Sequence, residues 1–233
     1  MSLFDNLDLQ EIPTPLYTFD VTYRLMSAFI SNTEEAVDLS ISAYKATGPH
    51  IDRIEICPEE GIYQHIEHYH GLDEHAGDII LDDVFEIHFP SLQRRSAFLT
   101  LIATYEHELE RFCDFHARKH QTPVKLNDLK GKGLERTHLF MKKLIGLEHS
   151  QSFPKIKKII KLRNSCAHND AKITENDGQE IATIRSLIDD TSIKVRQDGQ
   201  HVLIEKGFLS NVLEDLNSYI AEIQREIEKG KTQ

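Results

Sequence analysis

One long run of helical periodicity limits the folds open to this chain of 233 residues more than any other feature. After the sequence FPS at positions 89–91, large side chains recur every three or four residues. The members of this stripe are Phe98, Ile102, Tyr105, Leu109, Phe112 and His116. Such spacing predicts a long helix with one face that must be buried against other elements.

Four more helices are predicted by similar spacing or by start and stop signals, over residues 21–46, 134–147, 154–168 and 208–228. Pro154 suits the first turn of the third of these helices. Two β-prone runs flank Asp198-Gly199, a dipeptide that favours a hairpin turn. We therefore expect a mainly α fold, a helical bundle with a small β-hairpin near residues 192–206.

The segment from His50 to Pro90 gives a less consistent signal, because short apolar runs alternate with glycines and charged residues. Short strands and irregular cover both agree with this pattern. A chain of 233 residues can bury one substantial core. We treat residues 1–233 as one unit, with a helical core at about 91–228 and an N-terminal helical or irregular elaboration at about 1–90.

The composition, with 39% hydrophobic and 28% charged residues, is typical of a soluble globular protein. No apolar run approaches the roughly 18 residues of a membrane span, and the acidic N-terminal sequence is unlike a signal peptide. We expect a cytoplasmic protein with no membrane partner. Cys57, Cys113 and Cys166 lack the spacing of a disulfide framework or a zinc site, so we expect reduced thiols in or near the core.

Charge is distributed unevenly along the chain, whose net charge is −11. Residues 118–163 contain 13 Lys or Arg against three acidic residues, a net charge of +10, so the remaining residues carry −21. Such a basic centre agrees equally with two arrangements. It could be matched by acidic groups inside the protein, or it could form a local site for a polyanion.

The helix predicted at 154–168 ends in a concentrated set of polar groups. One stripe consists of Lys157, Lys161, Asn164 and His168, and a second of Ile156, Ile160, Arg163 and Ala167. Arg163 and His168 are five apart and point about 140° from each other on an ideal helix. They converge only if the arginine reaches across, if the helix frays at Ala167, or if a second copy supplies the partner.

Spacing alone favours an ordinary helix end, in which Arg163 pairs with a carboxylate and the lysines form a solvated face. A histidine also complements the dipole at a helix C-terminus. A nucleophilic pair of Cys166 and His168 is disfavoured, because residues two apart on a helix face away from each other.

The sequence RNSCAH, from Arg163 to His168, resembles the Arg-x4-His motif of the HEPN superfamily. These all-helical domains occur in ribonucleases of toxin–antitoxin, abortive-infection and CRISPR-associated systems. The resemblance includes the asparagine directly after the arginine and covers about Ser91 to Glu228. It implies an endoribonuclease of prokaryotic defence or a toxin, without metal or cofactor, and allows for an antitoxin or defence-system partner.

The resemblance also implies a homodimer in which two such motifs face each other and form one RNA-cleaving site. His168 would act as the acid or base, Arg163 would hold the scissile phosphate, and Asn164 would orient the histidine or the phosphate. We expect the interface to centre on the helix that ends at His168, since Ile156 and Ile160 on that helix require burial. If the basic segment binds RNA, Lys157 and Lys161 are its expected phosphate contacts.

An acidic residue on the long helix is a candidate addition to this site. Glu106 lies on the flank of the buried stripe and could orient Arg163 or His168, as an acidic residue on the preceding helix does in some HEPN relatives. An ordinary surface glutamate agrees with the sequence about as well. Glu108 is expected to project away from the stripe.

Other functions receive less support. A non-catalytic HEPN-like module that binds nucleotide, RNA or a protein is the main alternative to the ribonuclease. His65, His68, His70 and His75 form a histidine-rich segment, in which His65 and His68 would share a helix face, but the spacing matches no metal motif. We therefore expect this segment to be a solvent-exposed one. No Walker loop, GxGxxG or GxSxG sequence occurs.

Overall fold

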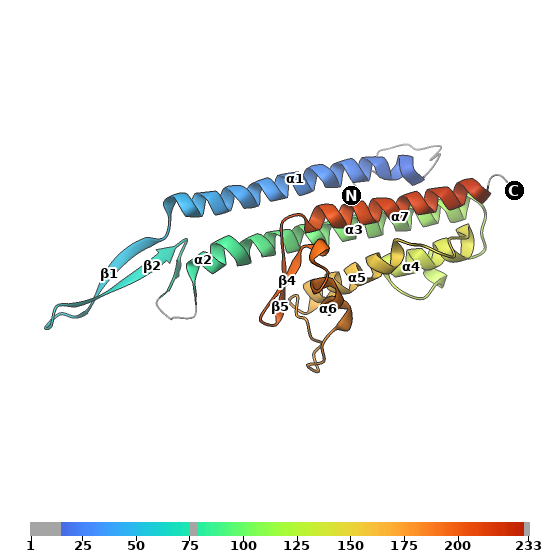
Figure 1. Cartoon of the computed structure of the whole chain (residues 1–233). Helices are drawn as coiled ribbons and strands as arrows, with labels where there is room; N and C mark the ends of the chain where they lie inside the picture. Colours follow the sequence, from blue (N-terminus) through green and yellow to red (C-terminus); the bar gives the residue numbers. More distant parts are fainter. Residues whose placement is uncertain (1–14, 75–78, 231–233) are drawn as a thin grey trace.

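Three long helices lie side by side and form the body of the molecule (Figure 1). They are α1 (Pro15–Thr47), α3 (Phe89–Lys119) and α7 (Phe208–Gly230) in a computed structural model that describes residues 15–74 and 79–230. The shorter α4 (Gly133–Phe140) packs on α3, and α5 (Phe153–His168) packs on both α3 and α7. The prediction of a mainly helical chain is confirmed.

The buried stripe predicted on α3 lies in the main core. Phe98, Ile102, Tyr105 and Leu109 are completely inaccessible to solvent, and Phe112 is buried. The same core takes in Phe19, Met26 and Ile30 of α1 as well as the apolar face of α7. The fold of the helical body therefore depends on α1 as much as on the helices that follow α3.

One prediction on α3 was wrong. Glu108 is buried at 5% exposure and does not project away into solvent. The helix contacts α1 and α7 as well as α4 and α5, so its buried arc is wider than one stripe and includes Glu108. Arg111, one turn further on, donates to the Glu108 carboxylate at 3.2 Å and so compensates part of its buried charge.

The remaining helical elements are short. α2 (Leu81–Asp83) continues through a π-helical turn at Val84–His88 directly into α3. The helix predicted at 134–147 is α4 followed by a π-helical turn at Met141–Ile145, which ends at Gly146 with φ of +86°. Two more elements, α6 (Ala182–Ile188) and a 3₁₀ turn at Thr191–Ile193, precede the C-terminal hairpin; another 3₁₀ turn spans Leu126–Asp128.

The predicted C-terminal hairpin is present. β4 (Val195–Asp198) and β5 (His201–Ile204) pair antiparallel, and Asp198 lies opposite His201 across the turn. Gly199 in this turn has φ of +54°, which a glycine adopts without steric cost.

A second hairpin occupies the segment that the sequence left open between strands and irregular cover. β1 (His50–Cys57) pairs antiparallel with β2 (Ile62–Tyr69), and β2 pairs with the short β3 (Leu72–Asp73). His65 and His68 therefore lie on a strand, and three residues apart they point to opposite faces rather than sharing a helix face. His65 is exposed and His68 half-exposed, whereas His75 lies outside the described residues.

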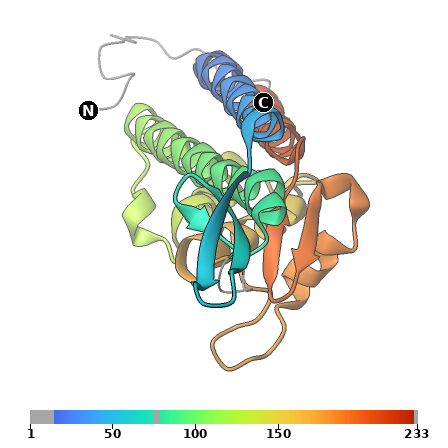
Figure 2. The same cartoon turned by 90° about the vertical axis from the view of Figure 1, so that its left-hand side faces the viewer.

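The β1–β2 hairpin projects from the end of the helical body (Figures 1 and 2). Its base is held by a small separate cluster of Tyr44, Tyr69, Leu81 and Phe85. Gly48 permits the close approach there, because a methyl group at this position would overlap the Tyr69 ring. Over the described part of the chain, no helix is both long and apolar enough to cross a membrane.

Candidate functional site

Helix α5 is fixed at its start by α7. The Glu222 carboxylate accepts hydrogen bonds from the backbone N–H and the hydroxyl of Ser152, at 3.0 and 2.8 Å, and from the Ser150 hydroxyl. A carboxylate at a helix N-terminus satisfies free N–H groups and complements the helix dipole. Lys155 in the first turn also pairs with Asp215 of α7 at 2.8 Å. These contacts set the direction in which α5 presents its last turn.

The apolar side of α5 is buried within the chain. Ile156 is 1% and Ile160 8% exposed, and Ile159, Leu162 and Cys166 are buried as well. The expectation that Ile156 and Ile160 call for a dimer partner is therefore wrong, because α3 and α7 pack on this helix. Ala167 is exposed and the helix continues regularly through His168.

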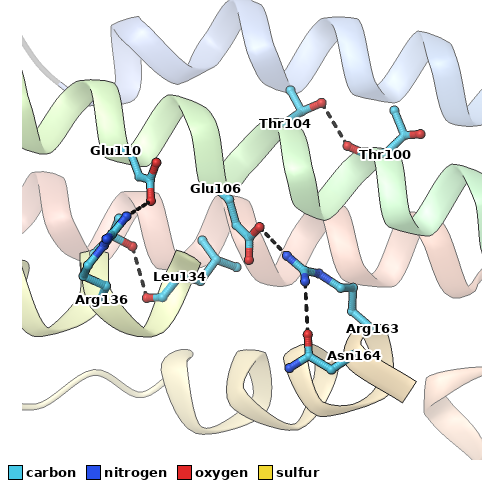
Figure 3. Close-up of polar contacts among 9 residues, drawn as sticks. Thr100, Thr104, Glu106, Glu110, Leu134, Arg136, Arg163 and Asn164 are labelled. Carbon is cyan, nitrogen blue, oxygen red and sulfur yellow. Dashed lines mark hydrogen bonds and ion pairs between the residues drawn. The ribbon is translucent and has the colours of Figure 1, made fainter. Parts of the chain in front are cut away.

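Arg163 is held by two neighbours (Figure 3). Its guanidinium donates to a carboxylate oxygen of Glu106 on α3, in an ion pair whose two side chains are only 21% and 18% exposed. It also donates to the side-chain oxygen of Asn164 at 3.0 Å. The carboxylate and the amide together fix the planar guanidinium, which remains partly open to solvent.

Gly133, at the start of α4, makes room for this pair. A Cβ atom at Gly133 would overlap the Glu106 carboxylate, and the backbone there has φ of +50°. Glycine meets both requirements, since it has no side chain and adopts positive φ readily. The predicted helix starts at residue 134, after Gly133, so the contact of Gly133 with the candidate site was missed.

His168 is the last residue of α5, and its side chain is exposed. Within the described ranges, neither a hydrogen bond nor an ion pair involves its imidazole. The chain then turns back along α5. Ser165 donates to the Lys172 carbonyl at 2.7 Å, and Asn169 to the Thr174 carbonyl at 2.6 Å. The imidazole is thus presented from a helix end that its own loop holds in place.

Asp170 lies two residues beyond His168 and ties this loop to α3. Its carboxylate accepts a hydrogen bond from Arg95 at 2.8 Å and lies 3.6 Å from the His201 ring on β5. The hydrogen bond from Arg95 lowers the pKa of Asp170 below its usual value. A fixed negative charge therefore stands near the end of α5, an interaction that the sequence did not reveal.

The lysines of α5 border an open pocket of about 340 Å³. Its polar lining comes from Lys157, Lys158, Lys161 and Asn164 of α5, with Glu135 of α4 and Thr183 of α6. All three lysines are exposed, and Lys161 pairs with Glu175 at 3.0 Å. No ion pair of Lys157 or Lys158 is found in the part of the chain that the structure describes. The pocket can accept an anion there.

Some residues of the basic segment have acidic partners in the structure, whereas others are exposed. Arg136, Lys155, Lys161 and Arg163 have acidic partners on other segments, respectively Glu110, Asp215, Glu175 and Glu106. Lys157 and Lys158 instead face the open pocket. The excess positive charge is thus partly matched inside the molecule and partly exposed beside α5.

Cysteine and metal chemistry receive no support at this site. Cys166 is buried, and this burial raises the pKa of its thiol to about 12, so that it stays protonated near neutral pH. Cys113 is also buried, and Cys57 is half-exposed on β1. Across residues 15–74 and 79–230, no cluster of three or more His, Cys, Asp or Glu side chains is arranged to bind a metal ion.

The structure brings Glu106, Arg163 and Asn164 together, places Lys157 and Lys161 beside them along α5, and shows no bond between Arg163 and His168 within the described residues. A fixed guanidinium is a group that can bind a phosphate, and an exposed imidazole is one that can transfer a proton, but within the described residues of one chain the two are not in contact. No protein-family model, no curated protein and no solved structure matches the chain. The residues themselves therefore carry the functional argument.

Proposed function

We propose that this protein is a metal-independent endoribonuclease of the HEPN type, with a composite active site at a homodimer interface. The observation that carries the proposal is the arrangement at the end of α5. There Arg163 is fixed by Glu106, while His168 is exposed on the same helix. A held guanidinium and a free imidazole are suited to phosphate binding and to proton transfer, respectively.

Each residue receives a role from its chemistry. His168 accepts the proton of an RNA 2′-hydroxyl or donates one to the leaving 5′-oxygen, because an imidazole has one nitrogen that can accept a proton and one that can donate it. Arg163 binds the scissile phosphate and the charge that develops on it. Glu106 and Asn164 hold the guanidinium in the required orientation, as their hydrogen bonds to Arg163 support.

The geometry of α5 supports the proposal of a second copy. Arg163 bonds to Glu106 and Asn164, and the helix is regular through Ala167. Neither an arginine that reaches across nor a frayed helix therefore brings Arg163 to His168 in one chain. Of the three ways in which the two groups could meet, the approach of a second α5 remains. The homodimer now rests on this spacing and on the family resemblance, without the apolar stripe.

The lysine pocket supplies the binding part of the proposal. Lys157 and Lys161 lie on the same side of α5 as Asn164, and they would bind RNA phosphates next to the scissile one. On the basis of the family resemblance, we further propose a role as a prokaryotic toxin or defence ribonuclease, with an antitoxin or another defence-system protein as partner.

A non-catalytic module is the second candidate, and one observation favours it. The charge of Arg163 is already compensated by Glu106, and the lining of the anion pocket includes Asn164 but neither Arg163 nor His168. A protein with this arrangement could bind RNA or a nucleotide at the lysines without cutting it.

The test is cleavage of a mixed set of labelled RNAs by the purified protein in excess EDTA. The ribonuclease proposal expects cuts that persist in EDTA and leave 2′,3′-cyclic phosphate ends, since the 2′-hydroxyl is the nucleophile. Binding of the RNAs without cleavage would replace it with the non-catalytic module. Cleavage that EDTA abolishes would contradict the metal-independent mechanism.

A further inference from the structure

The β1–β2 hairpin carries an unusual amount of exposed apolar surface. Large hydrophobic side chains that are at least 39% exposed include Ile51, Ile54 and Ile56 on β1 with Ile62 and Tyr63 on β2. Every residue from His50 to His65 is exposed except Cys57, which is half-exposed. A two-stranded hairpin with no covered face is marginally stable in water. The exposed apolar side chains and the marginal stability of an uncovered hairpin therefore both favour a partner that covers it.

The outer edge of β1 offers the site for that partner. The strand order is β1-β2-β3, so β1 has a neighbour on one side only within the described residues. Its unpaired backbone N–H and C=O groups form a template for another strand. The hairpin projects beyond the helices (Figure 1), and the residues of β1 from His50 to Ile56 are exposed.

The sequence of β1 is complementary to itself in one register. When two identical antiparallel strands pair about a two-fold axis, one residue faces its own copy, and its neighbours face each other reciprocally. Centring the pair on Asp52, Arg53 or Glu55 would oppose two like charges at the axis. Centring it on Ile54 opposes two isoleucines and places Arg53 opposite Glu55 of the second copy, twice.

The local structure agrees with this register. Arg53 and Glu55 lie on the same face of β1, and the Arg53 guanidinium lies 3.5 Å above the Tyr63 ring on that face. The β-bulge in β1 falls between Glu55 and Cys57, outside the three central pairs. Those pairs can therefore form a regular ladder, which ends where the bulge begins.

We propose that β1 is a homodimerisation strand, which pairs antiparallel with β1 of a second copy in the register centred on Ile54. The product is a four-stranded sheet in the order β2-β1-β1-β2. Antiparallel pairing sends the two helical bodies to opposite ends of this sheet, because each body adjoins the first residue of its own β1. This pairing lies at the hairpin and not at α5 (Figure 1), so it is a second interface, separate from the one proposed for the active site, and the inference does not depend on the ribonuclease proposal.

Charge reversal tests the pairing by its pattern. Arg53→Glu alone and Glu55→Arg alone each turn two attractive pairs into two repulsive ones, and each should raise the dissociation constant about tenfold or more in sedimentation equilibrium. A mixture of the two variants should recover a heterodimer, because each Glu then faces an Arg. Arg225→Glu on α7 is the matched control and should leave the dimer unchanged.

Cysteine cross-linking tests the register. In a Cys57→Ser background, Ile54→Cys should form an intermolecular disulfide on mild oxidation, because paired strands bring opposite Cα atoms within the range a disulfide spans. Gln64→Cys, exposed on β2 in the same background, should cross-link far less, and adding Arg53→Glu should suppress the cross-link of the Ile54→Cys variant. The proposal is overturned if Ile54→Cys does not cross-link more than Gln64→Cys, or if either charge reversal leaves the dissociation constant unchanged. It is also overturned if a mixture of the two charge-reversal variants forms no heterodimer.

Discussion

Gly133 shapes the candidate site without carrying a reactive group. Its backbone has φ of +50°, and a methyl group there would overlap the carboxylate of Glu106. Glu106 in turn holds Arg163. The space that Gly133 leaves open is therefore a condition for the ion pair between α3 and α5.

Gly133→Ala should lower the free energy of unfolding for two reasons. The left-handed backbone conformation costs about 1–2 kcal/mol for a residue with a side chain, and the overlap with Glu106 adds to this cost. In a Glu106→Ala background the overlap disappears, so the same substitution should cost about 1 kcal/mol less. Urea denaturation of the four proteins measures this difference.

Gly146→Ala is the control for that cycle. Gly146 has φ of +86°, and a methyl group there would meet open space. Its substitution should cost the same with Glu106 present or absent. Equal costs for Gly133→Ala in both backgrounds would show that Gly133 does not make room for the ion pair.

At the scale of residues, the sequence could predict contacts along one helix better than contacts between helices. The flank position of Glu106 left two environments open, one near α5 and one at the surface, and the structure pairs it with Arg163 of α5. Glu108 was assigned to the wrong environment, because one stripe does not reveal that α3 is packed on several sides. Gly133 gave no signal, since its neighbour Glu106 is 27 positions away.

Among the elements, α5 combines a buried apolar side with an exposed cationic one. Lys157 and Lys158 face the open pocket, whereas Lys161 is paired with Glu175. A lysine without an acidic partner contributes its full charge to a bound polyanion, and a paired lysine must first give up its partner. The two classes should therefore differ in RNA binding.

Lys157→Gln should flatten the dependence of RNA affinity on salt. Each phosphate contact to single-stranded RNA contributes about 0.7 to the slope of log affinity against log salt. We expect a decrease of up to about 0.7 for Lys157→Gln and a smaller one for Lys161→Gln, measured by fluorescence anisotropy. Lys229→Gln, at the end of α7, should not change the slope. Equal slopes in all variants would exclude this pocket from RNA binding.

α4 is joined to α5 and α7 by a half-buried histidine. The His138 ring stacks on Phe153 at 3.5 Å between centroids, and its Nδ1 lies 2.9 Å from the Tyr219 hydroxyl. Burial, together with the charge of Lys142, lowers the pKa of His138 from 6.5 to about 4, although Glu222 opposes the shift. The folded protein therefore keeps this ring neutral at pH values where the unfolded chain protonates it.

The free energy of unfolding should decrease as pH falls from about 6.5 toward 4, because the unfolded state then binds a proton that the folded state does not. His116, whose pKa burial also lowers to about 4, acts in the same direction. His138→Gln should reduce the loss of stability between pH 7 and pH 5, as measured by urea denaturation. The control His149→Gln, at an exposed position, should lose as much stability between pH 7 and pH 5 as the wild-type protein does. An unchanged loss in His138→Gln would contradict this assignment.

Elements with long apolar periodicity or a clear turn signal could be predicted, whereas β1 and β2 could not be distinguished from irregular cover. The stripes on α3 and α7 pack into one core, and their spacing alone predicted both helices. β1 and β2 lack such a signal because almost none of their side chains is buried, so alternation between a core face and a solvent face is absent. The exposure that prevented the prediction of these strands is also the observation that suggests a partner strand for β1.

For the molecule as a whole, the net charge of −11 concealed a local cationic site. Several basic residues of the +10 segment are matched by acidic groups, whereas Lys157 and Lys158 face the open pocket. A sum over the sequence cannot separate these two groups, because pairing depends on which helices meet. Nor could the sequence show that Ile156 and Ile160 are covered by the chain itself.

The central claim is that His168 transfers a proton during RNA cleavage. The most direct measurement compares kcat/KM for cleavage of one RNA in EDTA by wild type, His168→Ala and the exposed control His149→Ala. Melting temperatures of the same samples separate a loss of activity from a loss of folding.

The account predicts that His168→Ala loses about 10²-fold or more in kcat/KM, since general acid or base groups typically contribute 10² to 10⁴. Its melting temperature should hardly change, because an exposed histidine at a helix end contributes only about 0.3–1 kcal/mol. His149→Ala should cleave as wild type does. Wild-type cleavage by His168→Ala, or no cleavage by the wild-type protein, would contradict the claim.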